Sequence, residues 1–126
     1  MKVQLYSDIH LEFSPDFSVK NLGADVLVLA GDICVAHVLH KLDKTQFDPG
    51  EMRKVVLANN YYDFIKDCCS KFENVIYVLG NHEHYQGHID KSYDLIKKHF
   101  QFDNLQVLEN EHVEIDGYRF IGAHLS

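Results

Sequence analysis

The amino-acid sequence predicts an α/β fold, in which helices cover a largely parallel β-sheet. Continuous apolar runs at Val26–Ala30 and Val75–Leu79 are typical of strands that are buried on both faces of a sheet. Apolar residues recur at helical spacing between these two runs and again after the second one. Because strands and helices alternate along the chain, we expect right-handed crossover connections between parallel strands.

The individual elements follow from their periodicities. Residues Val3–Tyr6 alternate with the period of two that is typical of a strand, and they precede the two apolar runs. We expect one helix between the second and third strands, and another after the third. The apolar positions that define these helices are Tyr61, Ile65, Cys68 and Phe72, followed by Ile89, Tyr93, Ile96 and Phe100.

An antiparallel hairpin closes the predicted fold. Val113 and Ile115 alternate with charged residues, and the alternation resumes at residues 118–120. Between the two segments, Asp116 and Gly117 form the pair that a type I′ turn prefers, because both of its central residues need a positive φ. We therefore expect a β-hairpin with its turn at this pair.

Composition favours one folded domain over residues 1–126, because 46% of the residues are hydrophobic. No stretch is apolar for long enough to span a membrane, and Met1 leads directly into a strand, so we expect a cytoplasmic protein. The net charge of -7 does not indicate nucleic-acid binding, although it leaves that partner open. The cysteines lack the spacing of a zinc or disulfide framework, so we interpret them as buried thiols: Cys34, Cys68 and Cys69.

Metal-seeking residues follow the first strand. Asp8 and His10 are separated by one residue, so both side chains can reach one ion. Their mixture of carboxylate and imidazole suits Mn²⁺, Zn²⁺ or Fe better than Ca²⁺. Alternatively, Asp8 caps a turn and His10 lies at the surface.

The second and third strands lead into similar clusters. Gly31 allows a sharp turn before Asp32, a carboxylate that can bridge two ions or, alternatively, cap a helical turn. After the third strand and Gly80, Asn81 offers an amide oxygen and His82 an imidazole that can donate a proton near neutral pH. Glu83 is better suited to orienting an imidazole or a loop. Ligands in open α/β sheets bind at such strand ends, so the sequence predicts a divalent-metal site there.

In this order the three clusters, Asp-x-His, Gly-Asp and Gly-Asn-His-Glu, resemble the signature of the calcineurin-like metallophosphoesterase superfamily. The resemblance implies the N-terminal part of a four-layer αββα sandwich with a mixed sheet, crossover helices and a terminal hairpin. It implies that Asp8 and His10 bind a first metal, that Asp32 bridges two metals and that Asn81 binds the second. It also implies that His82 protonates or stabilises the leaving group, while a metal-bound hydroxide attacks a phosphomonoester or phosphodiester. We assign no residue to an organic cofactor.

The sequence lacks some of the metal ligands that are typical of this family. The family has a further strand-end His and a Gly-His-x-His element, and neither occurs before Ser126. The first ion keeps three ligands and the second keeps only Asp32 and Asn81, so we expect at most one tightly bound metal per chain. His124 is a weaker candidate for a substitute ligand. Because the second sheet would be incomplete, we expect the chain either to be a C-terminally truncated domain or to form a homo-oligomer.

Two other classes remain open. The chain can be a metallophosphoesterase-like binding or scaffold module with impaired catalysis, although a pure scaffold has no need of the signature residues. A structural zinc domain is the weaker alternative, because closed zinc sites usually contain paired cysteines. Metal-dependent stabilisation without hydrolysis distinguishes the scaffold from the enzyme.

Overall fold

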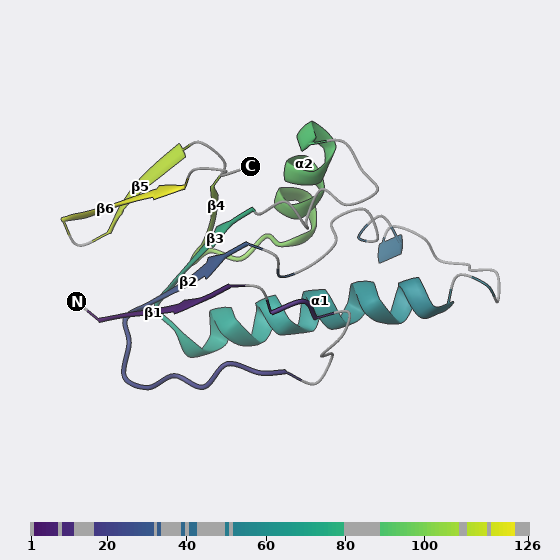
Figure 1. Cartoon of the computed structure of the whole chain (residues 1–126), viewed down its shortest axis with the longest axis horizontal. Coiled ribbons are helices and arrows are strands. Elements are labelled where there is room, and N and C mark those ends of the chain that lie inside the picture. Colours follow the sequence, from purple (N-terminus) through teal and green to yellow (C-terminus); the bar gives the residue numbers. More distant parts are fainter. Residues whose placement is uncertain are drawn as a thin grey trace.

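In the residues that it describes, the computed structural model contains a parallel sheet, two α-helices and a hairpin (Figure 1). It describes residues 2–7, 9–11, 17–31, 33, 39, 41–42, 50, 52–79, 89–108, 111–115 and 117–122. In chain order the elements are β1 (Val3–Tyr6), β2 (Val26–Ala30), α1 (Met52–Lys71), β3 (Asn74–Val78), α2 (Ile89–His99), β4 (Leu105–Leu108), β5 (Glu111–Ile115) and β6 (Tyr118–Gly122). This arrangement confirms the predicted α/β class.

The main sheet has the strand order β1-β2-β3-β4, and every pair in it is parallel. Strands β5 and β6 form a separate antiparallel sheet, with Val113 paired with Phe120 and Ile115 with Tyr118. Gly117 has a φ of 83°, as the predicted turn requires, whereas Asp116 lies outside the described residues. The hairpin is therefore confirmed, and it is a second layer rather than an extension of the main sheet.

Both helices pack on one face of the main sheet. Their buried side chains include Tyr61, Ile65 and Ile96, which belong to the same core cluster as Leu27 and Tyr77 of the sheet. The predicted helical periodicity therefore identified the face of α1 that enters the core. Within the described part of the chain, no helix is long and apolar enough to cross a bilayer.

The hairpin covers the opposite face of the main sheet (Figure 1). A smaller apolar cluster of Val26, Ile76 and Leu108 lies there, and side chains of both hairpin strands pack against it. The cover does not extend to β1, where Val3 is 46% exposed and Leu5 is 66% exposed. These two residues pair in register with Val26 and Val28, so they lie on the face that the hairpin covers only in part.

Strand β1 faces the helices with its other side. The Gln4 side chain lies there, donating a hydrogen bond to the Lys20 carbonyl (3.0 Å) and accepting one from the Leu22 N–H (2.7 Å). These bonds fix the segment that leads from β1 to β2. The period of two thus identified the strand, but its aliphatic residues Val3 and Leu5 are exposed, whereas Tyr6 packs against the main core.

Candidate metal centre at the carboxyl edge of the sheet

The segments predicted to contain the metal ligands and the catalytic histidine all begin at one edge of the main sheet. Because the strands are parallel, their carboxyl ends lie together, as Figure 1 shows. The register aligns Tyr6 with Leu29, Ala30 with Val78, and Val78 with Leu108. This is the edge at which open α/β sheets bind their ligands.

The turn after β2 depends on glycine. Gly31 is buried and has a φ of 89°, a left-handed conformation that other residues adopt only at a cost in free energy. The expected sharp turn at Gly31 is therefore confirmed. It directs the chain away from β2 immediately before position 32.

His10, close behind β1, also has a left-handed backbone. Its φ is 50°, and in the described part of the chain it is the single residue other than glycine with a positive φ. The side chain is half-buried and its Nδ1 atom is buried. Such backbone conformations cluster at functional sites, where surrounding contacts hold them in place.

A backbone hydrogen bond joins the segments that follow β1 and β2. The Leu11 N–H donates to the Ile33 carbonyl over 3.1 Å, and both side chains are buried in the main core. Leu11 follows His10 directly, and Ile33 follows Asp32 directly. Sequence reasoning missed this anchor, although an apolar residue immediately after each polar cluster is a signal that could have revealed it.

Most of the predicted site residues lie outside the described residues. Among the predicted ligands the structure describes only His10, and among described residues no three His, Cys, Asp or Glu side chains gather into a group. The site residues that the structure does not describe are Asp8, Asp32, Asn81 and His82, together with Glu83 and His124.

The described thiols do not contribute to this chemistry. Burial raises the pKa of Cys68 to about 12 and that of Cys69 to about 11, and the charge of Asp67 raises the Cys68 value further. Both thiols are thus protonated at neutral pH, and a thiol in that state is a poor nucleophile and a poor metal ligand. The interpretation as buried thiols is confirmed for Cys68, whereas Cys69 is half-buried.

A comparison with known protein families identifies the family of this chain. Residues 1–124 match the family model described as calcineurin-like phosphoesterase. The matched range includes the clusters at the ends of β1, β2 and β3 and extends through the hairpin. A search of curated proteins found no match to this sequence. With its parallel sheet, its covering helices and this match over nearly its whole length, the chain belongs to the calcineurin-like phosphoesterase family.

Proposed function

We propose that the chain hydrolyses phosphate esters at the carboxyl edge of its main sheet, in a reaction that depends on a divalent metal. The family consists in general of metal-dependent phosphoesterases, which supports the reaction class. The observation that carries the proposal is the hydrogen bond between Leu11 and Ile33. It ties together the two segments that contain His10 and Asp32, so that ligands from both can serve one ion.

The donors proposed for this ion are Asp8, His10 and Asp32. Two carboxylates and an imidazole fit Mn²⁺, Zn²⁺ or Fe, and the buried Nδ1 atom of His10 lies in the water-poor setting that favours ligand binding. Three protein ligands are enough for a catalytic ion with an open position. When bound, such an ion offsets the charge on phosphoryl oxygens and lowers the pKa of a water molecule at the site.

The chain's other residues supply orientation and a proton. In the proposal, Asn81 contributes a neutral oxygen ligand from the segment after β3, and the His82 imidazolium donates a proton or a hydrogen bond to the leaving oxygen. Both phosphomonoesters and phosphodiesters fit this chemistry, because loops set substrate choice in such folds.

Hydrolysis of aryl phosphate esters tests the proposal. The chain is assayed with a nitrophenyl monoester and a bis-nitrophenyl diester, with and without added Mn²⁺, as wild type and as His10→Ala and His82→Ala variants. We expect metal-dependent turnover that falls about 100-fold in each variant, because each loses a ligand or a general acid. Lys66→Ala, at an exposed position of α1, is the control that keeps the wild-type rate.

Two results would contradict the proposal in different ways. Equal rates in wild type and His82→Ala would show that the measured hydrolysis does not occur at this site. Metal-dependent thermal stabilisation that His10→Ala abolishes, in a chain without any turnover, would favour the scaffold alternative.

A further inference from the structure

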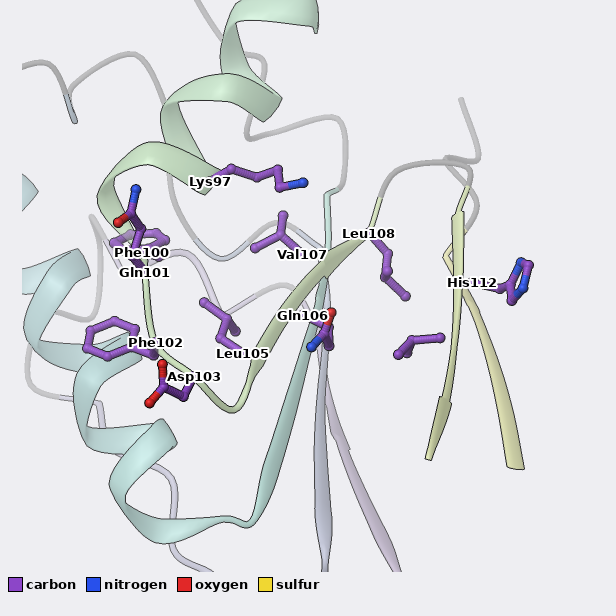
Figure 2. A pocket seen from close by; sticks show the side chains of 11 residues that line it. Lys97, Phe100, Gln101, Phe102, Asp103, Leu105, Gln106, Val107, Leu108 and His112 are labelled. Carbon is purple, nitrogen blue, oxygen red and sulfur yellow. The ribbon is translucent and has the colours of Figure 1, made fainter. Parts of the chain in front are cut away.

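We draw no further inference here: the strongest candidate, the groove of about 440 Å³ that runs along β4 between α2 and β5 (Figure 2), carries none, because nothing in the described part of the structure shows what covers it.

Discussion

Replacing Gly31 with alanine tests whether the turn after β2 supports a reaction centre. Gly31 is buried and its φ is 89°. A left-handed backbone costs an L-amino acid about 1–2 kcal/mol, and the new methyl group must also fit into a buried position. We expect the free energy of unfolding to fall by about 1–3 kcal/mol in total. For a chain of this size, each kcal/mol corresponds to a decrease in Tm of roughly 3–6 °C.

Gly23→Ala is the matched control for this substitution. Gly23 has a φ of 96°, nearly the same as Gly31, but it is exposed and an added Cβ meets no atom within 4 Å. It precedes β2, so it lies at the amino edge of the sheet, opposite the proposed centre. Gly23→Ala therefore introduces the same backbone strain without crowding the site.

The assay compares hydrolysis of the aryl phosphodiester in Mn²⁺ by the two variants, after confirming that each is folded at the assay temperature. A displacement of about 1 Å at a reaction centre can cost about 100-fold in rate, so we expect a loss of this order in kcat/KM for Gly31→Ala. Gly23→Ala should stay within about twofold of wild type. The Mn²⁺-dependent rise in Tm should shrink in Gly31→Ala alone, because weaker binding gives less stabilisation by mass action.

Equal activity in the two glycine variants would refute the reasoning. It would mean that strain at Gly31 is absorbed without moving the segment that follows, and that the turn has no special role in the reaction. A loss of activity in both variants would instead point to a general effect of destabilisation.

Two further predictions concern stability and association. Burial raises the pKa of Cys68 from 9.0 to about 12, so the unfolded chain releases this proton first, and the free energy of unfolding should decline between pH 9 and 12. Urea unfolding should show a shallower decline in Cys68→Ala, and an unchanged slope would contradict the assignment. Leu5→Lys changes a side chain that is 66% exposed on an edge strand, so it should alter the free energy of unfolding by at most about 0.5 kcal/mol. It should also reduce self-association in light scattering, and a large destabilisation would show that Leu5 is covered in solution.

The main elements of the fold were predictable because strands that are buried on both faces appear in the sequence as continuous apolar runs. Val26–Ala30 was predicted to the residue, and the third strand was displaced by one residue from its observed bounds, Asn74–Val78. Strand β4 (Leu105–Leu108) was missed, because this short apolar segment was not recognised as a strand although the Asp103-Asn104 turn separates it from its helix. Its position becomes evident only once β3 is present to pair with it.

The sequence predicted an edge of the sheet for the candidate site, and its assignment of individual ligands stays a prediction, because most of them lie outside the described residues. The clusters after β1, β2 and β3 identified the carboxyl edge, because parallel strands bring those ends together. Sequence reasoning missed the bond from Leu11 to Ile33 because it joins segments that are more than 20 residues apart, and the apolar residue after each polar cluster is only a weak local signal of it. It also missed the left-handed backbone of His10, because a positive φ is uncommon for residues other than glycine.

The order of the strands has a consequence for how the protein forms during synthesis. Each strand of the main sheet is hydrogen-bonded to the strand that directly precedes it in the sequence, so the sheet can grow from one side as the chain leaves the ribosome. Among the described strands of this sheet, none has to be inserted between two that are already paired, so the hydrogen bonds that have formed between strands need not break. The bond between Leu11 and Ile33 needs only the first 33 residues, so the first half of the candidate centre can assemble before the segment after β3 has been made.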